Sequence, residues 1–128
     1  SSMSTSTLIN SFTSSNGQNY IAYCFHSVSG VSKVGSYPGN GTTGQLIPTN
    51  FTPRFLLVKA TSGLSYHNWY IFDSVRGDTY LKADRNDADQ TSPTLNPTFG
   101  STGFRWESGD NSGGWNASGT TYLYMAIA

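Results

Sequence analysis

The chain has 128 residues and a formal net charge of zero, with only 11% charged and 14% aromatic side chains. This balance excludes the disordered class, which is highly charged and poor in aromatic residues. It also removes the electrostatic basis for binding nucleic acid or an anionic membrane surface, and the seven basic residues are scattered. We therefore expect no nucleic-acid partner.

Short runs of β-branched and aromatic residues recur along the chain, separated by turns of Gly, Asn and Ser. We expect strands at Tyr20–His26, Ser32–Tyr37, Arg54–Ala60, Trp69–Asp73, Thr79–Ala83, Gly103–Glu107 and Tyr122–Ala128. No run has the periodicity of an amphipathic helix. The pattern predicts an all-β fold, a single β-sandwich of jelly-roll or Greek-key type, and a β-barrel has the same signature.

Two of these runs predict which strands are buried. Arg54–Ala60 is almost continuously apolar, as expected of a central strand covered on both faces, and the run from Trp69 is similar. Trp69 and Trp106 both lie in strand runs, so we expect them in the core. Asp84–Pro97 is the longest segment without a strand, and it predicts a surface loop or an edge crossing, which could include one short helical turn around Asp84–Asp89.

The beginning of the chain is similar to its end. Gly17-Gln-Asn-Tyr-Ile-Ala-Tyr23 is echoed by Gly119-Thr-Thr-Tyr-Leu-Tyr-Met125, and Thr7–Phe12 by Thr94–Phe99. Such self-similarity indicates a tandem array with a repeat of roughly a hundred residues. We interpret residues 1–7 as the end of a preceding segment or a cloning remnant, and residues 8–128 as a single sandwich module, one unit of that array.

A lone cysteine cannot form an internal disulfide or a cysteine-based metal site within one chain. Cys24 lies in the apolar run Tyr20–Phe25, so we expect a buried, unreactive thiol.

No apolar stretch reaches the roughly 18 residues of a membrane helix, and we expect no membrane insertion.

Several motifs follow one another along the chain, namely Tyr20–Val28 followed by Gly35–Gly41, then Phe51–Lys59, Asn68–Ser74, Gly103-Phe104 and Asn116–Ala126. Together they resemble modules of bacteriophage tail and tail-fibre proteins, as found in marine and cyanobacterial phages. The resemblance covers nearly the whole chain from Leu8, in order. The chain departs from the pattern at Pro38, where the family tends to have Thr, and at Ser65–His67, an insertion before Trp69.

The resemblance implies a virion structural or adhesion module in a tail or fibre, and it supplies no catalytic or binding residues. Partners would be other virion proteins, with a host-surface glycan as a further ligand. Because phage fibres are commonly trimeric, it also implies a homo-oligomer. A purely architectural virion module, and a bacterial lectin-like module derived from a prophage, are the alternatives.

A sugar site would need an aromatic platform and neighbouring hydrogen-bonding groups. Trp115 lies in the glycine-rich stretch with Asp110 and Asn111, and Tyr66 with His67 forms a second stretch of this kind. These five residues are the candidate ligand-binding residues. Trp115 could instead close one end of the sandwich or lie in a subunit interface.

Metal binding and catalysis have weaker signals. Asp84–Asp89 alternates oxygen ligands as Ca²⁺ prefers, but it lacks the glycine and glutamate of an EF-hand loop, and a solvated loop fits better. A glycosidase needs two carboxylates about 5 to 10 Å apart, and Glu107 with Asp110 is the nearest pair in sequence. His26 and His67 have no marked partner. We therefore expect neither an enzyme nor a metal or cofactor.

Overall fold

The computed structural model describes residues 23–62, 68–91, 96–108 and 115–128, all in strands, turns and extended loops without a helix. The strands are β1 (Ser32–Pro38), β2 (Gln45–Pro48), β3 (Phe55–Ala60), β4 (Trp69–Asp73), β5 (Thr79–Lys82), β6 (Gln90–Thr91), β7 (Pro97–Gly100), β8 (Gly103–Trp106) and β9 (Thr121–Ile127). The all-β fold predicted from the sequence is confirmed.

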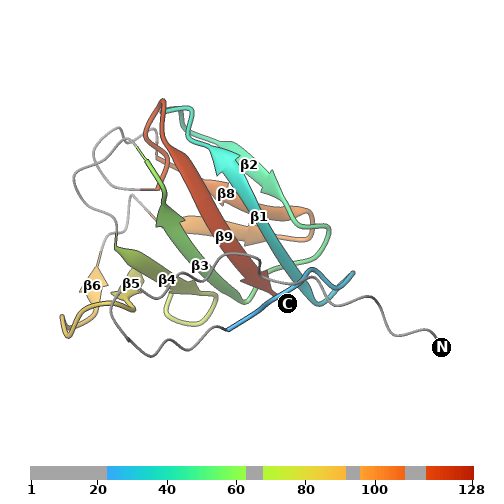
Figure 1. The fold of residues 1–128 in the computed structure, drawn as a ribbon, viewed down its shortest axis with the longest axis horizontal. Helices are drawn as coiled ribbons and strands as arrows, with labels where there is room; N and C mark the ends of the chain where they lie inside the picture. Colours follow the sequence, from blue (N-terminus) through green and yellow to red (C-terminus); the bar gives the residue numbers. More distant parts are fainter. Residues whose placement is uncertain (1–22, 63–67, 92–95, 109–114) are drawn as a thin grey trace, which may run out of the picture.

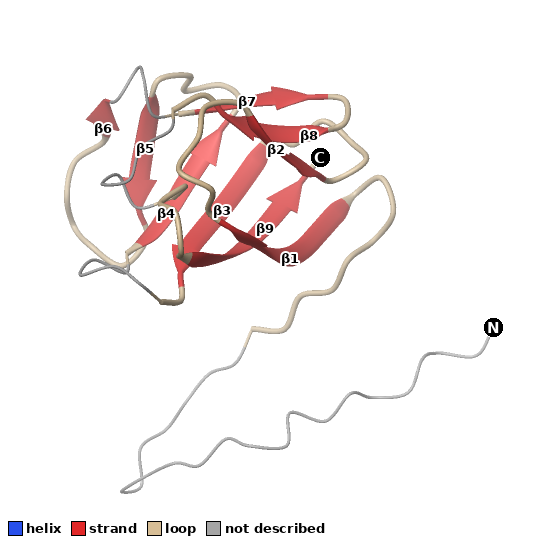
Figure 2. Cartoon of the chain, turned by 90° about the horizontal axis from the view of Figure 1, so that it is seen from above, coloured by secondary structure: helices blue, strands red, loops and turns tan. Residues whose placement is uncertain are grey.

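The strands form two antiparallel sheets that face each other across the core (Figures 1 and 2). The larger sheet has six strands in the order β1-β9-β3-β4-β5-β6, and the smaller has the order β2-β8-β7. Consecutive strands β3, β4 and β5 lie side by side, and β9 returns to lie beside β3, which is a Greek-key arrangement. The last strand in sequence is therefore a central strand of the larger sheet.

Six of the seven predicted strands are present within a residue or two of their predicted bounds. The remaining predicted strand, Tyr20–His26, is wrong in the part that the structure describes, because Tyr23–His26 forms no strand. Sequence reasoning missed β2, β6 and β7, which have two to four residues each. The helical turn predicted at Asp84–Asp89 is also absent, since a turn at Ala83–Asp84 leads into extended chain.

Burial alternates along the central strands. In β3, Leu56, Val58 and Ala60 are buried, whereas Phe55, Leu57 and Lys59 on the opposite face remain partly exposed. The prediction of a strand covered on both faces is therefore wrong, because the three-stranded sheet covers only the inner face. The outer face of the six-stranded sheet keeps apolar side chains that no second layer of the described fold covers.

The core is mainly aromatic. Trp106 of β8 is fully buried and contacts Phe72 edge-to-face at 5.5 Å between ring centroids and Phe104 at 5.7 Å. Tyr37 of β1 stacks on Tyr122 of β9 at 5.1 Å. Edge-to-face and offset pairs of this kind stabilise a fold beyond the burial of their area. The prediction that Trp106 lies in the core is confirmed.

Candidate functional site: the outer face of the six-stranded sheet

Trp115 is part of the core. Its side chain is 2% exposed, and its ring lies edge-to-face against Tyr70 at 4.9 Å, Tyr80 at 5.2 Å and Phe72 at 5.3 Å. A ring enclosed on these sides cannot stack on a sugar, so the structure does not support a recognition role for Trp115. The alternative interpretation, a tryptophan that closes the space between the sheets, fits its position.

The chain after Trp115 is held by buried polar groups. The Tyr37 hydroxyl donates to the Trp115 carbonyl at 2.6 Å, and the Ala117 amide donates to the Tyr122 hydroxyl at 2.9 Å. Burial raises the pKa of Tyr37 well above its ordinary value, and the neighbouring Tyr122 raises it further. The Tyr37 hydroxyl therefore keeps its proton to a higher pH than an ordinary tyrosine and continues to donate to the Trp115 carbonyl.

Asn116 fixes the same segment from the other side. Its Oδ1 accepts from the Asn40 amide at 3.1 Å, and its Nδ2 donates to the Thr42 carbonyl at 2.9 Å. Asn116 is 1% exposed, so its own amide group depends on these protein partners for its hydrogen bonds. The segment 115–117 is thus tied to the loop after β1 by side-chain hydrogen bonds as well as by packing.

The other four predicted ligand residues, Asp110, Asn111, Tyr66 and His67, lie in the segments 109–114 and 63–67, outside the described residues. Their role in sugar binding stays a prediction.

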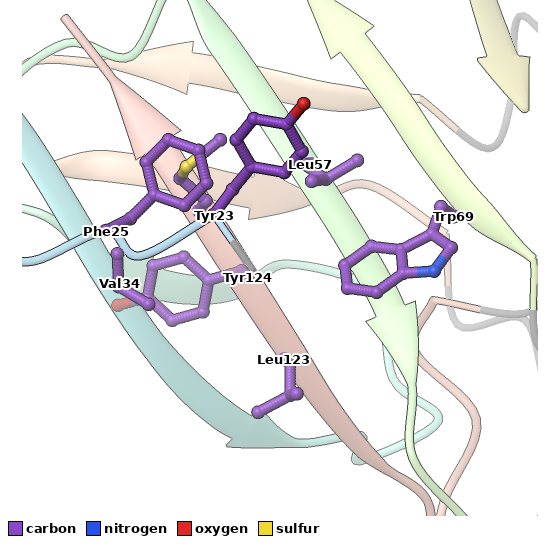
Figure 3. A pocket seen from close by; sticks show the side chains of 8 residues that line it. Tyr23, Phe25, Val34, Leu57, Trp69, Leu123 and Tyr124 are labelled. Atoms are coloured by element: carbon purple, nitrogen blue, oxygen red, sulfur yellow. The ribbon is translucent and has the colours of Figure 1, made fainter. Parts of the chain in front are cut away.

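An apolar groove lies on the outer face of the six-stranded sheet (Figure 3). It encloses about 380 Å³ over side chains from four neighbouring strands, namely Val34, Leu123, Met125, Leu57 and Trp69. Tyr23 and Phe25, from the chain before β1, line it as well. Several of these side chains stay open to solvent, including Leu123 at 46% and Val34 at 40% exposure.

Strand register explains why the groove is continuous. Met125 of β9 is directly opposite Val34 of β1 on one side and Leu57 of β3 on the other, and Leu57 is opposite Ile71 of β4. Four apolar side chains therefore form a row across four strands. Side chains directly opposite on one face of a sheet lie within contact distance.

Trp69 is on this outer face, so the prediction that it lies in the core is wrong. In β4, Tyr70 and Phe72 point inward, which leaves Trp69 and Ile71 on the outer side because side chains alternate along a strand. The Trp69 ring is 37% exposed, and the Lys59 ammonium lies over it at 5.1 Å from the ring centroid. An apolar run in the sequence does not show which of its two alternating sets of side chains faces the core.

Cys24 is exposed, which contradicts the prediction of a buried thiol. The prediction assumed that Tyr20–His26 forms a strand of this sandwich, and the described part of that segment does not. The neighbouring side chains Tyr23 and Phe25 are 79% and 61% exposed. An apolar segment therefore lies at the surface, where its residues Tyr23 and Phe25 form part of the groove lining.

The carboxylates of Asp84–Asp89 have other partners. Asp87 accepts a hydrogen bond from Lys82 at 3.1 Å and pairs with Arg85 at 3.1 Å. The hydrogen bond from Lys82 is the main reason that the pKa of Asp87 is lowered. Asp84 accepts from the Trp69 amide at 3.1 Å. Among the described residues no three His, Cys, Asp or Glu side chains gather as metal ligands.

Glu107 and His26 have ordinary surroundings. Glu107 is exposed and accepts a hydrogen bond from the Thr98 hydroxyl at 2.6 Å, and its predicted companion Asp110 lies outside the described residues. His26 is exposed, and its carbonyl accepts from the Ser32 hydroxyl at 3.1 Å.

Within the described ranges, no helix is long and apolar enough to span a membrane.

Comparison with known proteins gives one match. The model of a family described as a domain of unknown function, DUF7483, matches residues 1–128. No curated protein and no solved structure matches the chain.

Proposed function

This chain belongs to the DUF7483 family of domains, and we propose that it is a structural module of a phage virion, of the tail-fibre type, that works through protein–protein contacts. The observation that supports this proposal is the apolar groove on the outer face of the six-stranded sheet. The motifs that resemble phage tail modules suggest the virion as its location.

The physical argument rests on the cost of leaving apolar side chains in water. Burial of apolar surface is worth about 25 cal/mol per Å². Val34, Leu123 and Trp69 each keep more than a third of their surface exposed, on strands β1, β9 and β4 of one sheet face. Contiguous patches of this kind usually mark interaction sites. Neighbouring virion proteins or other copies of the module would cover it, and we expect a homo-oligomer.

Attachment to a host-surface glycan is the second candidate. It now rests on Asp110, Asn111, Tyr66 and His67, since the burial of Trp115 removes the main aromatic platform. The groove itself suits a sugar poorly, because its lining is almost entirely apolar and offers few partners for sugar hydroxyls. We therefore favour the architectural role. Repetition along a fibre could still raise weak glycan contacts by about 10² to 10⁴ in avidity.

Sedimentation velocity over a range of protein concentrations tests the proposal. We expect the full chain to self-associate and Leu123→Glu to stay monomeric. Glutamate at this position would lie directly opposite Lys59, so the sheet tolerates the charge. Val75→Glu is the matched control, since Val75 is an apolar residue 92% exposed outside the groove. It should associate like the original chain.

The same protein clustered on beads is then tested on a bacterial panel and a glycan array. A monomer that binds cells or glycans would contradict the architectural role and support attachment. A monomer that binds neither would contradict the expected homo-oligomer and the attachment role, and would leave other virion proteins as the partners that cover the groove. Self-association that Leu123→Glu leaves intact would show that the groove is not the contact surface.

A further inference from the structure

Two aromatic side chains stand out from the protein at the rim of the groove. Tyr23 and Phe25 line the groove, yet 79% and 61% of their surfaces are exposed (Figure 3). We propose that this face binds a second copy of the chain about a two-fold axis, with Tyr23 and Phe25 of each copy packed into the groove of the other. This inference rests on the proposed role of the groove in protein–protein contacts, and it names the partner.

Hydrogen bonds to β1 hold the two rings in place. The Val34 amide donates to the Ser27 hydroxyl at 3.0 Å, and this hydroxyl donates to the Val34 carbonyl at 3.4 Å. Val28 and Ser32 exchange two backbone hydrogen bonds of 2.9 Å across a turn. The Ser32 hydroxyl also donates to the His26 carbonyl at 3.1 Å. The segment that carries the rings is therefore fixed before a partner arrives, which lowers the entropy lost on binding.

The same hydrogen bonds close the neighbouring edge of the sheet. β1 is the first strand in the order of the six-stranded sheet, so one of its edges pairs with no strand of the described fold. An open edge of this kind invites strand addition from another chain. Here the backbone groups of Val34 and Ser32 are already bonded, and Pro38 has no N–H to donate. A second copy therefore meets the side chains of the face and not an open edge.

A face that carries both protruding rings and a groove is complementary to itself. An interface about a two-fold axis uses one patch twice, so each contact of one copy is repeated by its partner. The groove offers the rings apolar side chains, among them Leu57, Leu123 and Met125. The formal net charge of zero leaves no overall repulsion between two copies. A second copy thus brings the matching side chains with it, whereas any other partner must supply its own.

The area available is that of a small dimer. A buried aromatic side chain contributes about 150 to 250 Å², so the exposed parts of Tyr23 and Phe25 amount to roughly 300 Å² per copy. The groove that receives them loses a similar area, which gives roughly 1,200 Å² for the pair of copies. Specific interfaces bury about 1,200 to 2,000 Å². We therefore expect a reversible dimer of modest affinity.

Sedimentation velocity of the full chain with Tyr23→Ser and Phe25→Ser tests the proposal. We expect the original chain to stop at dimers as its concentration rises. The double variant should dimerise at least about 100-fold more weakly, because each dimer loses four rings. Cys24→Ser is the matched control, since it changes the exposed residue between the rings and prevents a disulfide between copies. It should dimerise like the original chain.

Photocrosslinking identifies the contact directly. The full chain is made with p-benzoylphenylalanine in place of Phe25, mixed with an isotopically heavy copy of the original chain and irradiated. We expect crosslinked peptides that join the light chain at position 25 to the heavy chain at Leu57 or at Leu123–Met125. Crosslinks to the heavy chain only at other surfaces, or crosslinks only within one chain, would overturn the proposal.

The other outcomes separate this inference from the proposed function. Stronger association of the double variant would show that the rings cover the groove of their own chain, and trimers or open-ended growth would exclude the two-fold arrangement. If Leu123→Glu abolishes association and the double variant does not, the groove is still the contact surface but the rings do not fill it. A monomeric original chain would overturn the pairing of two copies and leave other virion proteins as the partners of the groove.

Discussion

Truncation of Trp115 to alanine should remove a large part of the protein's free energy of unfolding. The sequence alone places this residue in a glycine-rich stretch, which does not reveal that role. Removing a buried tryptophan side chain costs about 3 to 5 kcal/mol. Trp115 is 2% exposed and contacts four aromatic rings, of Tyr70, Phe72, Tyr80 and Trp106, at 4.9 to 6.0 Å between centroids. We therefore expect about 4 kcal/mol for Trp115→Ala, out of a total of about 5 to 15 kcal/mol for a typical domain.

Urea denaturation followed by far-ultraviolet circular dichroism measures this loss without depending on tryptophan fluorescence. With a slope of about 2 kcal/mol per molar urea, the midpoint should fall by about 2 M. Trp69→Ala is the matched control, since the same side chain is removed from the outer face. It loses a partly exposed ring and its contact with Lys59, so we expect about 1 kcal/mol.

Equal midpoints for the two variants would refute the placement of Trp115 in the core. The expected result also has a practical consequence for any test of sugar binding. Loss of binding in Trp115→Ala would report unfolding, so the glycan hypothesis is better tested with Tyr66→Ala and Asp110→Ala.

Three further predictions follow from the described residues. Asn116→Ala should cost about 1 to 3 kcal/mol by urea denaturation, because it removes two hydrogen bonds of a buried amide, and a loss below about 0.5 kcal/mol would contradict this. Because burial raises the pKa of Tyr37, the unfolded state releases this proton first, so the free energy of unfolding should fall as pH rises above about 10. In Tyr37→Phe that decline should be shallower, and an unchanged slope would assign the alkaline sensitivity to other groups. Millimolar Ca²⁺ should leave the thermal midpoint unchanged, since Asp87 is paired with Lys82 and Arg85, whereas a bound ion at 100 times its dissociation constant would add about 2.7 kcal/mol.

The sequence by itself determined the fold class and most of the larger sheet. Strands such as β3, β4 and β9 are long runs of β-branched and aromatic residues bounded by turns, and that signal is local. β2 and β7 were missed because they are short and have proline at one end, and their pairing with β8 rather than their own sequence makes them strands. The tandem array suggested by the similarity of Gly17–Tyr23 to Gly119–Met125 stays a prediction.

Only the tertiary structure decided which side of each strand is inside. In β4 the residues Trp69 and Tyr70 are both suited to a core, and the position of the second sheet selects Tyr70. Trp115 follows a glycine-rich stretch, yet it is buried because the rings of Tyr70, Phe72 and Tyr80 enclose it from strands distant in sequence. Cys24 is exposed because the described part of its segment, Tyr23–His26, forms no strand of either sheet. Burial depends on which surfaces meet, and that is settled by contacts between segments far apart in the chain.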